Sequence, residues 1–86
     1  MEYILDVSEL RSCGAFHARL KETLSFPVWY GKNLDALYDA LSEVSATVRL
    51  QHWDHAEAAL GNYGKNTRRT LTEAALRNGP LEVIFE

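Results

Sequence analysis

The chain has almost no cysteine and no long apolar run, and each absence excludes a class of protein. Cys13 is the single cysteine among 86 residues, so no internal disulfide can form and a reducing cytoplasm fits. No stretch approaches the roughly 18 apolar residues of a transmembrane helix. Residues 1–7, MEYILDV, are acidic, and their apolar run is too short for a signal peptide. We therefore predict a cytoplasmic protein that has no membrane partner.

Basic charge is scarce as well. Nine Lys and Arg residues stand against twelve Asp and Glu residues, which gives a net charge of −3. Nucleic-acid binding needs a concentrated basic surface, so this balance predicts no nucleic-acid partner and is compatible with a basic protein partner. Gly61, Gly64 and Gly79 are interpreted as turn residues, because no phosphate-binding glycine motif surrounds them. We expect no cofactor.

Two small clusters could carry chemistry, but simpler interpretations fit both. His52 and His55 are three residues apart, yet a predicted strand-to-helix junction separates them and no further ligand is close in sequence. We therefore expect no metal site. Cys13 and His17 stand four apart on a predicted helix, but no third group is evident to orient a Cys–His nucleophile. We interpret this pair as a core thiol beside a surface imidazole.

The first half of the chain predicts one strand and two helices. Few polar positions interrupt residues 1–7, which is typical of a central strand. Ser12 can cap a helix that runs to about Leu24. Asn33 can cap a second helix over residues 33–43.

The second half predicts two strands and two helices. Apolar and polar residues alternate over 47–53, which indicates a half-buried strand. Asp54 is a good cap for a short helix, and a turn is expected at 62–64. The remaining elements are a helix over 55–60 closed by Gly61 and Asn62, a helix from Lys65 to Arg77 ended by residues 78–80, and a strand over 81–85.

This order of elements indicates the fold class. Helices separate all three strands, so each connection must be a crossover, and parallel strands are the simplest solution. We predict a single α/β domain over residues 1–86, a three-stranded parallel sheet covered by about four helices.

The second predicted helix carries the clearest functional signal. Leu34, Leu37 and Leu41 recur at i, i+3 and i+7, which makes one apolar stripe. An acidic face with an aromatic residue at its edge suits a cationic partner. The opposite arc of this helix carries Asp35, Tyr38, Asp39, Ser42 and Glu43.

The two aspartates allow other interpretations. Asp35 and Asp39 could work as an acid–base pair, as in glycoside hydrolysis, but 86 residues leave little room for a sugar cleft. They could also be a solvated face, on which Asp35 is favoured in the first turn by the helix dipole. Like charges at this spacing repel weakly, so we expect the pair to have a role other than the stability of the helix.

Aromatic residues flank the acidic face. Trp29 and Tyr30 are consecutive, so we expect them to point in different directions, with Trp29 outside as an interface anchor. Tyr38 lies among the acids, where the helix has no local need for an aromatic residue.

The segment FPVWYGKNLDALYDALS, residues 26–42, resembles the barstar family. The shared pattern is a proline, an aromatic pair, Gly, a variable residue and then Asn-Leu-Asp-Ala-Leu-aromatic-Asp. Weaker similarity extends over nearly the whole chain. The resemblance implies an intracellular inhibitor without enzyme activity, a monomer when free, which binds a small, basic, secreted microbial ribonuclease in a 1:1 complex and blocks its active site.

The resemblance also implies roles for individual residues. Asp39 would plug the catalytic site, and Asp35 would contact the base-recognition loop or a neighbouring cation. Glu73, on the last helix, would add a further acidic contact. Aromatic anchors, shape and backbone contacts would come from Trp29, Tyr30, Gly31, Asn33, Leu34, Tyr38 and Ser42.

Two departures from the family pattern bear on specificity. The type member has Trp where this chain has Tyr38, and Tyr where it has Trp29, so the interface aromatics are exchanged in size. The alternative function is a binding module of the same fold, whose partner is a different cationic toxin or a housekeeping protein.

Overall fold

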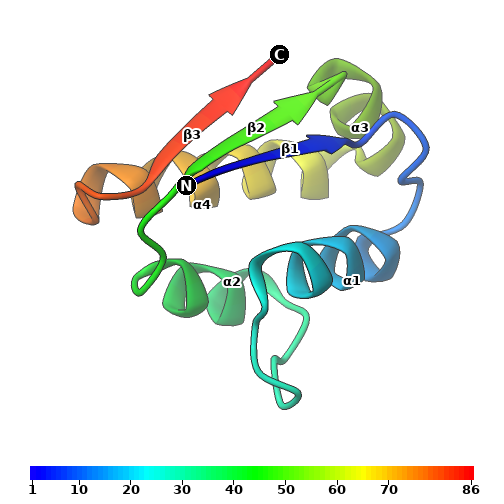
Figure 1. Ribbon diagram of the computed structural model, residues 1–86. Helices are drawn as coiled ribbons and strands as arrows, with labels where there is room; N and C mark the ends of the chain where they lie inside the picture. Colours follow the sequence, from blue (N-terminus) through cyan, green and yellow to red (C-terminus); the bar gives the residue numbers. More distant parts are fainter.

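Three parallel strands form one sheet in the order β1-β2-β3, and four helices accompany it (Figure 1). The computed structural model describes residues 1–86. The predicted α/β class and the parallel sheet are therefore confirmed. The elements are β1 (Glu2–Asp6), α1 (Cys13–Leu24), α2 (Leu34–Leu41), β2 (Thr47–Gln51), α3 (Trp53–Leu60), α4 (Asn62–Arg77) and β3 (Glu82–Phe85).

Strand β1 lies at an edge of the sheet, so the prediction of a central strand there was wrong. The central strand is β2, which pairs with both others. Ile4 explains the error, because this apolar residue lies on the solvent side of β1 and is 57% exposed. Its presence made a strand with one buried face look as if both faces were buried.

The caps of the first two helices are those that the sequence predicts. The Ser12 side chain accepts a hydrogen bond from the backbone N–H of Ala15 at 3.1 Å. The Asn33 side chain accepts one from the N–H of Ala36 at 2.8 Å. These bonds satisfy N–H groups that a helix start leaves without a partner.

The second half of the chain departs from two local predictions. Helix α3 begins at Trp53, and the residue before it is His52, with a φ of 62°. Asp54 therefore lies in the first turn of α3 and does not cap the helix. Residues 62–64 are helical and not a turn, because α4 begins at Asn62. Gly64 allows this helix to approach α3 closely: a Cβ there would lie 2.8 Å from the carbonyl oxygen of Glu57.

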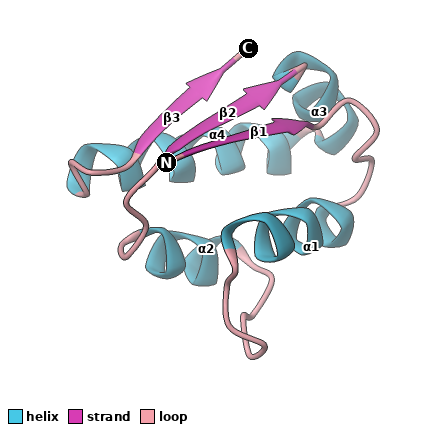
Figure 2. Cartoon of the chain, in the orientation of Figure 1, coloured by secondary structure: helices cyan, strands magenta, loops and turns pink.

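The two faces of the sheet differ in their surroundings. Leu5, Val48 and Leu50 are buried against the helices, and Figure 2 shows α1 and α2 together on one side of β1. Alternate residues, such as Glu2 and Ile4, are exposed on the other face. We call this other side the open sheet face. Helices therefore cover one face of the sheet only.

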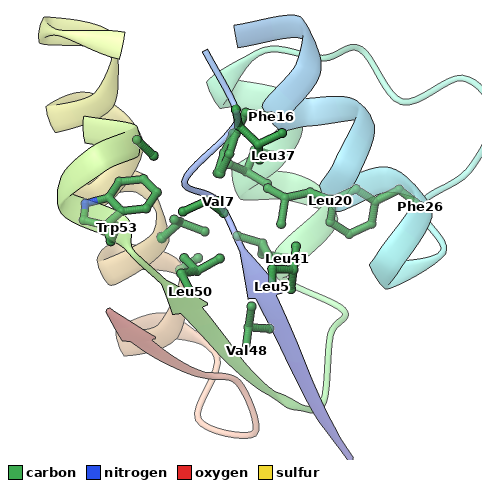
Figure 3. Close-up of a cluster of buried hydrophobic side chains, with 14 of the residues drawn as sticks. Leu5, Val7, Phe16, Leu20, Phe26, Leu37, Leu41, Val48, Leu50 and Trp53 are labelled. Carbon is green, nitrogen blue, oxygen red and sulfur yellow. The ribbon is translucent and has the colours of Figure 1, made fainter. Parts of the chain in front are cut away.

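The leucines of α2 lie in the core. Leu37 and Leu41 are almost completely buried, and Leu34 is partly buried. Figure 3 shows Leu37 and Leu41 among the side chains that fill the space between β1, β2 and α1. Burying a leucine of this kind contributes roughly 1.5–3 kcal/mol. This packing fixes the orientation of α2, and the opposite side of the helix faces outward.

Candidate protein-binding surface

The segment before α2 is a loop that projects away from the sheet (Figure 1). We call residues 25–32 the aromatic loop. Trp29 is 82% exposed and Tyr30 is only 7% exposed, so the predicted division into an outer and an inner aromatic residue is confirmed. Val28 is also exposed. The tip of the loop thus presents apolar surface to solvent, which is typical of an interaction site.

Tyr30 attaches this loop to the body of the protein. Its ring packs on Phe26, with 4.9 Å between ring centroids, and its hydroxyl lies 2.6 Å from Nδ1 of His17. Burial, with a smaller contribution from Tyr63, raises the pKa of Tyr30 far above its ordinary value of 10.0. The Tyr30 ring is therefore not part of the outer surface, and it supports its neighbours from inside.

His17 is fully buried, so its prediction as a surface imidazole was wrong. Its ring lies between two hydroxyls, those of Tyr30 and Tyr63, and the second is 2.7 Å from Nε2. Cys13, predicted in the core, is half-exposed instead. A signal for the buried histidine does exist in the sequence, since His17 stands three residues before Leu20 and seven before Leu24, on the apolar side of α1.

Asp35 and Asp39 are exposed on the outer side of α2. The four ion pairs of the chain involve other residues, so neither carboxylate has a cationic partner within the protein. No group of three or more His, Cys, Asp or Glu side chains that could hold a metal ion is found. What the pair can do chemically is accept hydrogen bonds from cationic groups that come from outside the chain.

The ends of α2 are held by local hydrogen bonds. The Asn33 amide donates to the carbonyl of Gly31 at 3.4 Å, besides capping the helix. Ser42 ends the helix earlier than the predicted residue 43, and its hydroxyl donates to the carbonyl of Asp39 at 2.6 Å. Leu34 is half-buried at the first position. The predicted shape-giving residues thus lie around Asp35 and Asp39 in a defined geometry.

A hollow of about 450 Å³ separates the aromatic loop from α2. Trp29 and Tyr30 line it from the loop, and Asp39 lines it from the helix. Glu43, which was noted on the acidic arc but not proposed as a contact, lines it as well. A cationic side chain of suitable shape could enter this hollow between aromatic and acidic walls.

Tyr38 lies at the junction of α2 and α4. It is half-buried and packs against the core cluster, and it lines a small hollow of about 120 Å³ together with Ser42 and Ala74. Glu73 precedes Ala74 and is exposed on α4. Asn78 was expected only as part of the end of the last helix, but it also joins the two helices, because its side-chain amide donates to the carbonyls of Leu41 and Val44 at 2.9 and 2.7 Å.

The fold and this surface together define a small α/β protein with an exposed, acidic, aromatic-edged helix. The family described as Barstar (barnase inhibitor) matches residues 1–86, the whole chain. The chain therefore belongs to the barstar family, which is a family of ribonuclease inhibitors and not of enzymes. The resemblance predicted from residues 26–42 is confirmed.

A relative in Bacillus subtilis (strain 168) carries the description "Putative ribonuclease inhibitor YrdF". It is 32% identical to this chain over 74 residues, which cover 83% of this chain and 81% of that protein. None of the helices is long and apolar enough to cross a membrane.

Proposed function

We propose that this protein is a cytoplasmic inhibitor that binds a small, basic, secreted microbial ribonuclease in a 1:1 complex and blocks its active site. One observation carries the proposal: Asp35 and Asp39 stand exposed and without an internal cation on a helix that the core holds in place. Membership of the barstar family supports it. Inhibition by occupancy needs neither a cofactor nor a reaction step.

The acids would act as substitutes for RNA phosphates. Asp39, in the middle of the surface, would make charge-assisted hydrogen bonds to Arg and His side chains in the catalytic site of the enzyme. Asp35, one turn earlier, would meet a neighbouring cation or the base-recognition loop. Because Leu37 and Leu41 fix the helix before binding, little conformational entropy is lost when the complex forms.

The residues around the acids would supply area and shape. Trp29, exposed at the loop tip, would be an aromatic anchor, and Tyr38 would contribute the edge of its ring beside α4. Glu73 would add an acidic contact from α4. Tyr30 would act from inside, by holding the loop. Contacts of shape and backbone would come from Gly31, Asn33, Leu34 and Ser42.

The proposal is tested by titrating the activity of secreted ribonucleases with the purified chain. We expect inhibition of at least one enzyme with an end point near one inhibitor per enzyme. Asp39→Ala should weaken binding at least thirtyfold, because interface hot spots, among them an aspartate of the family's type member, cost about 2 kcal/mol or more on truncation.

Asp54→Ala is the matched control, since it removes one exposed aspartate from another helix, α3. It should leave the affinity unchanged. If no ribonuclease is inhibited, or if both variants weaken binding equally, the proposal fails. Capture of a different cationic toxin, with dependence on Asp39, would establish the alternative binding module instead.

A further inference from the structure

The binding surface does not use the most deeply buried polar side chain of α1, the imidazole of His17. It is fully buried, and each of its nitrogens has a tyrosine hydroxyl as partner: Tyr30 at 2.6 Å and Tyr63 at 2.7 Å. Tyr30 belongs to the aromatic loop and Tyr63 to the first turn of α4. One ring therefore connects three separate segments of the chain.

The hydrogens of this network can be assigned from its partners. Tyr30 is buried, and Nδ1 of His17 is the one hydrogen-bond partner of its hydroxyl in the structure. Tyr30 must therefore donate to Nδ1, which leaves the hydrogen of the neutral ring on Nε2. That N–H donates to the hydroxyl of Tyr63, whose own hydrogen can turn toward solvent because Tyr63 is only half-buried.

A proton on Nδ1 would weaken the loop side of the network. Nδ1 would then be a donor, and the Tyr30 hydroxyl could accept from it only by turning its own hydrogen away, into a buried site where the structure shows no other partner for it. The surroundings also oppose a charged ring, since burial and the nearby Lys32 lower the pKa of His17 below its ordinary value of 6.5. The other titratable groups near the network are Cys13 and Tyr63, and no carboxylate pairs with His17.

The aromatic loop has few other attachments to the body. The Phe26 ring packs in the core cluster, and its N–H donates to the carbonyl of Lys21 at 3.0 Å. Lys21 Nζ reaches the carbonyl of Val28 at 3.4 Å, on the exposed surface. The hydrogen bond between Tyr30 and His17 is thus the buried side-chain hydrogen bond nearest to Trp29 along the chain. Its loss would leave the tip of the aromatic loop less firmly held.

We propose that His17 is a positioning residue for partner binding: its neutral ring ties Tyr30 to Tyr63, holds the aromatic loop in its binding geometry, and releases the loop when it takes up a proton. The consequence for binding rests on the proposed function. The loop must then be ordered again when the partner docks, so affinity falls as the ring becomes charged. A net hydrogen bond of ordinary strength corresponds to a loss of about two- to tenfold.

The first experiment needs no partner. NMR follows the ring nitrogens of His17 and the indole resonances of Trp29 and Trp53 from pH 8 to the onset of acid unfolding. We expect the Trp29 indole to shift with the titration of His17, and this step to vanish in His17→Gln, while the buried Trp53 reports that the fold persists. A Trp29 signal that ignores the titration of His17, or a ring that stays neutral until the protein unfolds, overturns the proposal.

The second experiment measures affinity for an inhibited ribonuclease across the same pH range. Tyr30→Phe and Tyr63→Phe each delete one hydroxyl from the network, but only Tyr30 belongs to the loop. We expect a loss of about two- to tenfold at neutral pH for Tyr30→Phe, a smaller one for Tyr63→Phe, and a shallower acid dependence in His17→Gln than in the wild type. The proposal is overturned if the two phenylalanine variants lose affinity equally and His17→Gln keeps the pH profile of the wild type. The network would then have a structural role only.

The two experiments separate the possible failures. If no ribonuclease binds, the proposed function fails, whereas the NMR titration still decides whether His17 positions the loop.

Discussion

Two exposed acidic surfaces of this protein differ in what surrounds their carboxylates. On the open sheet face, Arg49 bridges Glu2 and Glu86, at 3.1 and 2.8 Å. On α2, Asp35 and Asp39 have no cation of the chain as a partner. The sheet thus neutralises part of its own charge, whereas the acids of the helix have no counter-charge within the chain. Exposure alone does not distinguish the two surfaces, and the presence or absence of an internal counter-charge does.

The acids of the open sheet face are also hydrogen-bonded in ways that keep them ionised. Hydrogen bonds from the backbone and side chain of Ser8, and a weaker one from His52, lower the pKa of Asp6 to about 2. A hydrogen bond from Arg49 lowers the pKa of Glu86. These carboxylates have partners already, so we expect them to take little part in binding.

Removing the acids of one surface at a time should give the largest difference. Asp35→Ala/Asp39→Ala should lose at least about a hundredfold in affinity for the ribonuclease, since two charged contacts would disappear. Glu2→Ala/Glu82→Ala removes the same charge from the sheet and should leave affinity within about threefold. Calorimetric titration measures both, and equal losses would mean that only net charge matters.

Folding stability should move the other way on α2. Asp35 and Asp39 repel each other at i, i+4, and Asp39 lies outside the first turn that the helix dipole favours, so Asp39→Ala should stabilise the free protein by up to about 0.5 kcal/mol. Thermal unfolding of this variant checks the prediction. A clear loss of stability would show that Asp39 serves the fold.

Salt should act on association through the α2 surface. Raising the ionic strength from about 50 to about 500 mM should slow association with a basic enzyme by about tenfold, because screening weakens electrostatic steering. The Asp35→Ala/Asp39→Ala variant should show a shallower dependence, and stopped-flow kinetics measures the two slopes. Parallel slopes would place the steering charge elsewhere on the molecule.

Acid should destabilise the free protein in two separate pH ranges. The pKa of His17 is lower in the folded chain than its ordinary value of 6.5, so the unfolded chain takes up this proton first. The contribution of neutral His17 to the free energy of unfolding is complete above about pH 6.5. It is lost as pH falls toward the folded pKa of His17, by at most about 1.4 kcal/mol per pH unit. Below the folded pKa, His17 causes no further loss of stability.

The sheet acids follow in a lower range. The folded pKa of Asp6 is about 2, against an ordinary 3.8, so its contribution is present above 3.8 and is lost as pH falls toward 2. Urea unfolding at a series of pH values resolves the two ranges, and His17→Gln should remove the upper one only. If His17→Gln still lost stability in the upper pH range, that loss would belong to another titratable group.

Breaking the ion pairs of the open sheet face should have the smallest effect. Arg49→Ala deprives Glu2 and Glu86 of their cation, and exposed pairs of this kind contribute little to stability. We expect a slightly lower melting temperature and unchanged affinity for the ribonuclease. A marked loss of affinity would place the open sheet face in the binding surface.

The parts of the fold that the sequence predicts are those that neighbours along the chain decide. Ser12 and Asn33 cap their helices through N–H groups three residues away, and the leucine stripe of α2 follows from helical periodicity. The aromatic loop was divided correctly between Trp29 and Tyr30 because consecutive side chains diverge. These features need no knowledge of distant segments.

Several of the wrong predictions concern contacts between elements, which the local pattern does not show. The partners of His17 lie 13 and 46 residues away, so no local pattern could reveal its network. Gly64 is helical because its missing side chain lets α4 approach Glu57 of α3, and not because it turns the chain. The edge position of β1 follows from the strand order, which periodicity does not encode.

The most direct test of the account is to map the partner's footprint by NMR on the labelled chain, with an inhibited ribonuclease added in steps to equimolar amount. We predict changes in the amide resonances of the aromatic loop and of α2, centred on Asp39, and in the Trp29 indole. The amides of Ile4 and Arg49 on the open sheet face should keep their free positions. A footprint on the open sheet face that leaves α2 unchanged would contradict the account.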